Sequence, residues 1–160
     1  MTYHCPLCLS SSPQNYSKDK KRDYFRCGEC ELIFADPKAW PDQHQEKAIY
    51  DYHQNSPEQQ GYRDFLSQLA EPLNRKLAPA SKGLDFGCGS GPTLSLLMEQ
   101  RGHAVALYDP FYFPNQEVLQ NTYQFITCTE VFEHMQAPGK EVERLHDMLE
   151  QGGLLGIMTK

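Results

Sequence analysis

The chain has 160 residues, of which 39% are hydrophobic and 22% charged, so it can form one soluble domain or a small module beside a modest core, but not two full-sized domains. No run approaches the roughly 18 apolar residues of a membrane span, and the N-terminus lacks a secretory signal, so we expect a cytoplasmic protein with reduced cysteines and no membrane partner. The net charge of −6 is uneven, at +1 for residues 1–35 and −7 for the rest, which disfavours extensive nucleic-acid binding by the larger part.

Residues 1–35 contain two Cys-x-x-Cys pairs separated by eighteen residues. This spacing predicts a zinc ribbon in which two tight turns fold together into a tetrahedral cage, with strands at 24–26 and 32–34 whose aromatic side chains pack around the metal. Four protein ligands leave no open position, so the zinc is expected to be structural, while a rubredoxin-like iron site would use the same ligand set. The predicted metal ligands are Cys5, Cys8, Cys27 and Cys30. A small basic spot at 18–22 lies at the expected hairpin tip.

Residues 36–81 are expected to form a helical linker or cap. The run Ser56-Pro57-Glu58-Gln59 predicts a helix that begins with a capping Ser56 and a proline in its first turn. Apolar side chains follow at helical spacing, and Pro72 predicts a break or kink. A shorter helix is expected over 45–52.

From residue 82 onward, short apolar runs alternate with amphipathic stretches, which predicts βα units and a parallel sheet. We expect strands near 83–87, 104–108, 123–128 and 153–158, and helices near 91–101 and 138–150, the second ending at Gly152-Gly153. Because 110–122 is too short for a helix, a strand and a second helix, the third strand should be vestigial or missing. The predicted fold is α/β: a Rossmann-like, doubly wound, mostly parallel sheet over 82–160, preceded by the zinc-ribbon module.

The segment Leu84-Asp85-Phe86-Gly87-Cys88-Gly89-Ser90-Gly91 places three glycines between a strand and a helix. Such glycines bring backbone N–H groups close to a ligand, and Asp109, at the end of the next strand, can bind both hydroxyls of a ribose. The dinucleotide fingerprint is G-x-G-x-x-G, whereas this run is G-x-G-x-G with Asp85 before it. An NAD-dependent oxidoreductase is therefore the weaker interpretation.

At these residues the sequence resembles class I S-adenosylmethionine-dependent methyltransferases, whose first motif has this acid and these glycines. The resemblance covers about residues 82–159. It implies that Asp85 and the glycines hold the methionine portion of the donor and that Asp109 holds its ribose. The full predicted cofactor-binding set is Asp85, Gly87, Cys88, Gly89, Gly91, Asp109, Pro110 and Thr129.

The segment 123–134 looks like the corresponding part of small-molecule methyltransferases in that family. The Asn/Asp-Pro-Pro-aromatic tetrad that methylates planar amines is missing from the sequence, which argues against an adenine or glutamine N-methyltransferase. Glu130, Glu133 and His134 are the candidate catalytic residues, because a base is needed when the acceptor carries a proton. The alternative is that Glu133 and His134 only cap or tether nearby backbone.

Two further groups of side chains have alternative roles. One of Tyr50, Tyr52 and Tyr62 is a candidate to cover the carboxylate of the donor, as N-terminal tyrosines do in related folds, with core packing as the alternative. Cys88 and Cys128 are expected to be small buried residues and not nucleophiles.

The predicted function is methyl transfer from S-adenosylmethionine to oxygen or carbon of a small molecule, with a structural zinc. The alternatives are an RNA methyltransferase guided by the ribbon and a non-catalytic module that binds S-adenosylmethionine or a protein. The family fold continues beyond its fifth strand, so the sequence is expected to be a truncated core, or an oligomer whose partner covers the last strand at the sheet edge.

Overall fold

A computed structural model describes residues 3–52 and 56–159. At the N-terminus, three antiparallel strands form a small ribbon in the order β1-β2-β3, with β1 at Pro13–Lys18, β2 at Asp23–Cys27 and β3 at Ile33–Ala35. Asp19 closes the hairpin tip, because its Oδ1 accepts the N–H groups of Lys21 at 2.6 Å and Arg22 at 2.7 Å. The predicted ribbon strands are confirmed.

The second sheet has four parallel strands in the order β5-β4-β6-β7, with β4 at Lys82–Phe86, β5 at Ala104–Tyr108, β6 at Tyr123–Thr129 and β7 at Leu149–Met158. This confirms the predicted α/β, Rossmann-like fold. Between β5 and β6 the described chain has only the 3-10 helix η2 at Gln116–Gln120 and an isolated bridge from Asp109 to Phe113. The third strand of a regular doubly wound sheet is therefore missing, as predicted, and β5 is an edge strand.

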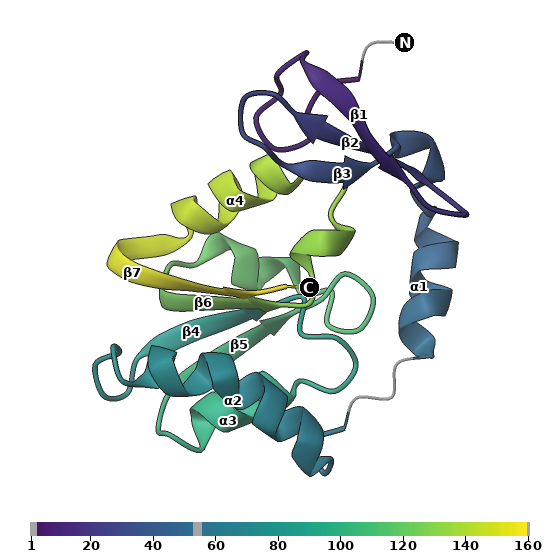
Figure 1. Ribbon diagram of the computed structural model, residues 1–160. Coiled ribbons are helices and arrows are strands. Elements are labelled where there is room, and N and C mark those ends of the chain that lie inside the picture. Colours follow the sequence, from purple (N-terminus) through teal and green to yellow (C-terminus); the bar gives the residue numbers. More distant parts are fainter. Residues whose placement is uncertain (1–2, 53–55, 160) are drawn as a thin grey trace.

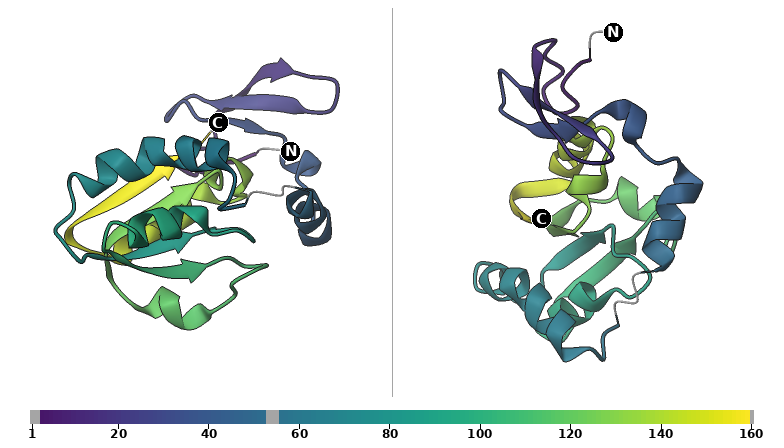
Figure 2. Two further views of the ribbon diagram at one scale, coloured as in Figure 1. Left: turned by 90° about the horizontal axis from the view of Figure 1, so that it is seen from below. Right: turned by 45° about the vertical axis from the view of Figure 1, so that its right-hand side comes forward.

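Helices cover both faces of this sheet, as Figures 1 and 2 show. On one face lie α2 at Gln60–Asn74 and α3 at Thr93–Glu99, and on the other lies α4 at Pro138–Asp147. Because side chains alternate along a strand, Phe125 of β6 packs with α2 and α3, while Ile126 packs with Leu145 of α4. Burial on both faces explains why the strands appear in the sequence as continuous apolar runs.

The segment that joins the ribbon to the sheet includes the 3-10 helix η1 at Pro37–Ala39 and helix α1 at Gln43–Asp51. A reciprocal capping box starts α1: the Asp42 side chain accepts the Gln45 N–H and the Gln45 side chain accepts the Asp42 N–H. This confirms the shorter predicted helix. In Figure 1, α1 stands beside the end of the sheet where β4, β5 and β6 finish.

Three local predictions are wrong. Ser56 does not cap a helix: it starts a turn, accepting the Gln59 N–H at its carbonyl, and α2 begins only at Gln60. The break predicted at Pro72 does not occur: the proline lies in the last turn of α2, where the loss of one N–H interrupts one hydrogen bond and the buried Leu73 keeps the helix on the core.

The glycine pair at 152 and 153 does not end α4. Helix α4 stops at Asp147, and β7 starts at Leu149 and runs through both glycines. Between the pairs Tyr123↔Leu149 and Phe125↔Leu154 the register shifts, and Gly152 has φ of +80°. The pair therefore forms a bulge in a strand, where only glycine adopts the backbone conformation without strain.

In the part of the chain that the structure describes, no helix combines the length and the apolar character needed to cross a membrane.

Candidate functional site

The loop between β4 and α3 lies at the carboxyl end of the central strand. Gly87 and Gly89 have φ of +74° and +65°, and the N–H groups of Gly87 and Cys88 both donate to the Tyr108 carbonyl, at 2.8 and 3.2 Å. A Cβ atom on Gly87 would lie 2.5 Å from Cγ2 of Val131, so this position needs glycine for space as well as for conformation. Gly91 has a different role: its carbonyl accepts the Thr93 N–H at 2.6 Å where α3 begins.

Asp109 follows β5 and is 7% exposed. Its Oδ2 accepts the Gly89 N–H at 3.0 Å, and its Oδ1 accepts the N–H groups of Phe111 at 2.8 Å and Tyr112 at 3.1 Å. The carboxylate therefore ties the glycine loop to the loop after β5. Since an ionised carboxylate has about four acceptor positions, these three bonds leave about one position for a further hydrogen-bond donor.

Asp85 lies inside the fold beneath α3 and is 2% exposed. Its Oδ1 accepts the Thr127 hydroxyl at 2.9 Å, and the Ser95 backbone N–H also donates to its carboxylate. Burial raises the pKa of Asp85 to about 6, because these two hydrogen bonds offset only part of the cost of desolvating the charge. The side chain thus joins β4, β6 and α3 behind the glycine loop.

The three candidate catalytic residues follow β6. Glu130 has φ of +56°, a conformation that costs a non-glycine residue about 1 kcal/mol or more, and its N–H donates to the Met158 carbonyl at 2.8 Å. The 3-10 helix η3 at Phe132–His134 comes next, and the Glu133 carboxylate accepts the Thr159 hydroxyl at 2.8 Å. Both residues are therefore attached to the end of β7, Glu130 through its backbone N–H and Glu133 through its carboxylate, whereas the exposed His134 makes its ring contact with Tyr50.

Helix α1 supplies the wall opposite these residues. The Tyr50 ring packs edge-on against His134 with centroids 5.5 Å apart and lies 6.1 Å from the Phe111 ring. Burial, with contributions from the Glu46, Asp109 and Glu133 charges, raises the pKa of Tyr50, so its hydroxyl stays protonated. Among the three candidate tyrosines, Tyr50 is the one that faces the carboxyl end of the sheet: Tyr52 is 88% exposed, and Tyr62, which lies on α2, packs against the core that α2 and α3 form.

A second contact from α1 was missed in the sequence. The Tyr112 hydroxyl donates to Asp51 at 2.7 Å, and Lys47 both pairs with Asp51 at 2.8 Å and lies over the Tyr112 ring at 5.3 Å. No sequence signal relates Asp51 to Tyr112, which are 61 residues apart.

The other predicted cofactor residues sit near the same strand ends. Cys88 is in the glycine loop, Pro110 follows Asp109, and Thr129 is the last residue of β6. Burial raises the pKa of the Cys88 thiol and of the fully buried Cys128, so neither is a ready nucleophile. The expectation of a buried thiol is confirmed for Cys128, whereas Cys88, in the glycine loop, is only partly buried.

The four predicted metal ligands come together in the ribbon. Their sulfur atoms all lie within 4.8 Å of one another, with Sγ of Cys5 3.5 Å from that of Cys30 and Sγ of Cys8 3.6 Å from that of Cys27. Tetrahedral zinc with Zn–S bonds of about 2.3 Å needs sulfur atoms about 3.8 Å apart, so the spacing fits zinc. Phe34 and Phe25 pack beside this cluster, as the sequence predicts.

The two knuckles have the same backbone arrangement. The first cysteine of each donates its N–H to the carbonyl five residues later, Cys5 to Ser10 at 2.8 Å and Cys27 to Leu32 at 2.9 Å. Leu9 and Glu31, each directly after the second cysteine, have φ of +60° and +62°. Two non-glycine residues in this conformation show that the cysteine turns are held in place by their surroundings.

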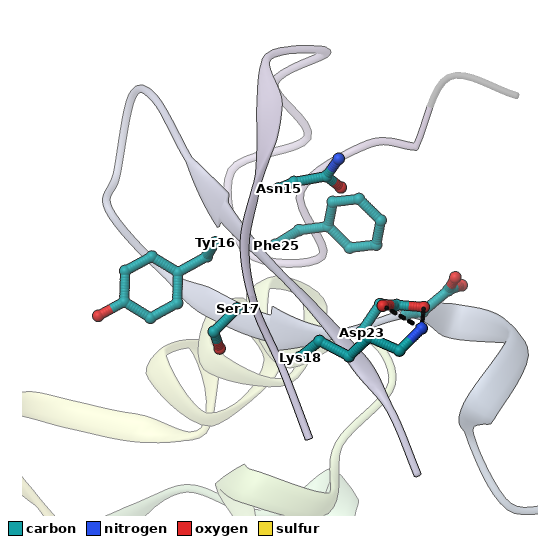
Figure 3. A pocket seen from close by; sticks show the side chains of 7 residues that line it. Asn15, Tyr16, Ser17, Lys18, Asp23 and Phe25 are labelled. Carbon is teal, nitrogen blue, oxygen red and sulfur yellow. Dashed lines mark hydrogen bonds and ion pairs between the residues drawn. The ribbon is translucent and has the colours of Figure 1, made fainter. Parts of the chain in front are cut away.

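A depression of about 520 Å³ lies on the hairpin, away from the glycine loop. Figure 3 shows Phe25 and the Lys18–Asp23 ion pair among the side chains that line it, and the ion pair is 3.1 Å long. It lacks the glycine loop and the convergent buried acids of the strand ends, so the strand ends remain the candidate site.

Residues 30–160 match the family of methyltransferase domains. The chain belongs to this family. The resemblance inferred from Asp85, the glycines and Asp109 is thereby confirmed for a methyltransferase domain that follows a cysteine ribbon.

Solved structures with a similar arrangement share little sequence with this methyltransferase domain. One is an S-adenosylmethionine-dependent methyltransferase from Geobacter sulfurreducens in complex with S-adenosyl-L-homocysteine, at 16% identity, 67% of this chain, 51% of that chain and a TM-score of 0.43. Two are the plantazolicin methyltransferase BpumL with S-adenosylhomocysteine and a desmethylplantazolicin analogue. The match to the monoazolic complex has 18% identity, covers 73% of this chain and 52% of that chain, and has a TM-score of 0.42. The match to the triazolic complex has 19% identity, covers 76% of this chain and 53% of that chain, and has a TM-score of 0.43. The chain spans about half the length of these structures. A search of curated protein sequences gave no match.

Proposed function

We propose that the chain binds S-adenosylmethionine at the carboxyl end of β4 and transfers its methyl group to a small molecule. The observation that carries this proposal is the position of the two left-handed glycines. They follow β4, and the chain passes from β4 to β5 on one side and then to β6 on the other. Ligands of open α/β sheets bind at such a switch point, outside the carboxyl ends of the strands.

In this proposal Asp109 binds the ribose hydroxyls of the donor. A ribose hydroxyl would donate to Asp109 Oδ2, which accepts the Gly89 N–H at 3.0 Å and, with about two acceptor positions per carboxylate oxygen, keeps room for one more donor. Gly87, Cys88 and Gly91 would line the methionine portion, while Pro110 and Thr129 would flank the nucleoside.

The acceptor would enter between η3 and α1. S-adenosylmethionine supplies an electrophilic methyl group on a sulfonium, so alignment in a site that excludes water provides most of the catalysis. His134 is the side chain we assign as general base where the acceptor loses a proton, because it is exposed, its ring contacts Tyr50 at the strand ends, and the neighbouring Glu133 carboxylate already accepts the Thr159 hydroxyl. Tyr50, protonated and half-buried against His134, would orient the imidazole. Oxygen and carbon acceptors both fit this assignment.

We also propose that Cys5, Cys8, Cys27 and Cys30 hold one structural zinc. The supporting observation is the match between the sulfur spacing and a tetrahedral site. A four-cysteine zinc is coordinatively saturated and stabilises the fold of a small module. Native mass spectrometry should show one zinc per chain, and a chain that carries no metal after purification in zinc would contradict this part.

The donor site is tested by isothermal titration with S-adenosylhomocysteine, with NADH as the comparison ligand. The test variant is Asp109→Asn, which keeps an oxygen for the loop N–H groups and removes the charge and one acceptor. The control is Asp147→Asn, at an exposed position on α4. We expect saturable binding of S-adenosylhomocysteine alone, weakened about 10-fold or more, or about 1.4 kcal/mol, by Asp109→Asn and unchanged by Asp147→Asn. Equal binding by both variants, or binding of NADH instead, would refute the assignment.

One observation favours a second candidate, an RNA methyltransferase guided by the ribbon. Lys20, Lys21 and Arg22 are exposed at the hairpin tip, beyond the Lys18–Asp23 pair. Replacing all three by alanine should abolish salt-dependent RNA binding if this alternative holds. Absence of such binding by the wild-type chain would leave the small-molecule assignment.

A further inference from the structure

The first cysteine knuckle packs directly on the start of helix α4. Helix α4 begins at Pro138, and its N-cap residue, Ala137, makes no side-chain cap. The first N–H after the proline belongs to Gly139, and it points to the Pro6 carbonyl at 3.3 Å. The backbone of the knuckle therefore takes the place of the missing cap. In Figure 1 the ribbon lies against this end of α4.

Gly139 is required by this contact and not by its own conformation. Its φ lies outside the left-handed region, and it occupies the second position of a helix, where alanine would be more stable by about 0.5 to 1 kcal/mol. A Cβ atom there would overlap the carbonyl oxygen of Leu7 and would lie 3.1 Å from its carbonyl carbon and 3.3 Å from its Cα. These are backbone atoms between two predicted zinc ligands, so they can move only if the knuckle moves.

The segment between β6 and α4 is thus held at both ends. At one end, Glu130 donates to Met158 and Glu133 accepts from Thr159. At the other end, Gly139 contacts the knuckle, and the Gln136 side chain donates to the Pro41 carbonyl at 3.4 Å. The residues that we assign to the acceptor side lie between these two attachments.

From this arrangement we propose that Gly139 is a positioning residue that couples zinc binding in the ribbon to the placement of the 130–139 segment. Zinc fixes the knuckle, the knuckle fixes the first turn of α4, and that turn sets one end of the segment that carries Glu133 and His134. By linkage, disturbing the start of α4 must weaken zinc binding by the same factor by which zinc stabilises the helix start. The role of the segment toward the acceptor rests on the proposed function, whereas the coupling itself does not.

The test compares Gly139→Ala with Gly61→Ala. Both glycines are the second residue of a helix, but a Cβ on Gly61 meets nothing within 4 Å. Alanine gains the same helix propensity at both positions, so only the contact with the knuckle differs. Zinc affinity is measured by competition with a chromogenic chelator, and hydrogen exchange is followed by mass spectrometry in peptides that cover 130–147, with β4 as the internal reference for a folded core.

We expect Gly139→Ala to weaken zinc binding by about 5-fold or more and Gly61→Ala to leave it unchanged. In the wild type, zinc removal should speed exchange in the 130–147 peptides while β4 stays protected, and zinc-loaded Gly139→Ala should show the same acceleration. Equal zinc affinities for the two variants would overturn the proposal. The same holds if zinc removal from the wild type leaves the hydrogen-exchange rates of the 130–147 peptides unchanged. The second measurement needs no variant, so it decides the matter even if Gly139→Ala fails to fold.

Neither readout involves the methyl donor. If the coupling is found but S-adenosylhomocysteine does not bind, the donor assignment fails and the positioning of the segment stands. If binding is found without coupling, the reverse holds.

Discussion

The buried Asp85 makes the free energy of unfolding of this methyltransferase domain depend on pH, and its contribution can be measured separately. Burial raises its pKa from 3.8 to about 6, so the folded state keeps the proton over a range in which the unfolded chain has released it. The stability contributed by Asp85 is therefore fully present below pH 3.8 and is lost as the pH rises through about 6. At about 1.4 kcal/mol for each tenfold change in the proton affinity, the whole loss is about 3 kcal/mol, of which about 2 kcal/mol falls between pH 4 and pH 7.5.

The variant Asp85→Asn removes this titration and nearly keeps the shape of the side chain. Urea unfolding of the wild type and the variant gives two free energies of unfolding at each pH, and their difference cancels any release of metal and the titrating groups that do not interact with Asp85. We expect the difference, variant minus wild type, to rise by about 2 kcal/mol from pH 4 to pH 7.5. An unsatisfied amide N–H in the variant would offset the whole curve without changing its slope.

The control is the exposed Asp147→Asn, whose difference from the wild type should stay flat. A flat difference for Asp85→Asn as well would refute the burial argument. It would mean that the Thr127 and Ser95 hydrogen bonds compensate fully for desolvation of the carboxylate.

Two further predictions test the core. Gly83→Ala should lower the free energy of unfolding by about 3 kcal/mol, because its Cβ would overlap ring atoms of the fully buried Phe125. The control Gly61→Ala should be neutral or slightly stabilising. Equal melting temperatures for the two variants would contradict this packing. In the presence of a chelator, iodoacetamide at pH 7.5 should label the four ribbon cysteines, because loss of the metal opens the ribbon, and it should leave Cys128 unlabelled, because that thiol is buried and its pKa is raised. A label on Cys128 in native protein would contradict its burial.

Local patterns in the sequence predicted the features that depend on neighbouring residues. The two cysteine pairs specified the ribbon because each pair forms one tight turn, and the glycines after β4 specified the loop because only glycine tolerates their φ values. The short connection after Asp109 also predicted the missing strand correctly, since a helix, a strand and a second helix need more residues than it has.

Features that depend on distant contacts could not be predicted in this way. Gly139 looks in the sequence like a poor helix residue, and its necessity appears only when the knuckle is placed against it. Pro72 was expected to break or kink its helix and Gly152 to end one, because of their low helix propensities, but packing carries α2 through the proline and pairing with β6 carries β7 through the glycine. In each case tertiary structure outweighs a local preference of about 1 to 3 kcal/mol.

The missing third strand explains why the N-terminal segment contributes to the site. In a regular doubly wound sheet, a helix and a strand after Asp109 would satisfy the backbone there. In this chain the Asp109 carboxylate accepts the N–H groups of Phe111 and Tyr112, and Asp51 of α1 accepts the Tyr112 hydroxyl. The shortened loop is thus held from two sides by charged groups, one of them on the helix that also carries Tyr50. The segment between ribbon and sheet therefore helps to hold the loop after β5, which the shortened core does not hold alone. Loss of this segment should disorder that loop before the sheet unfolds.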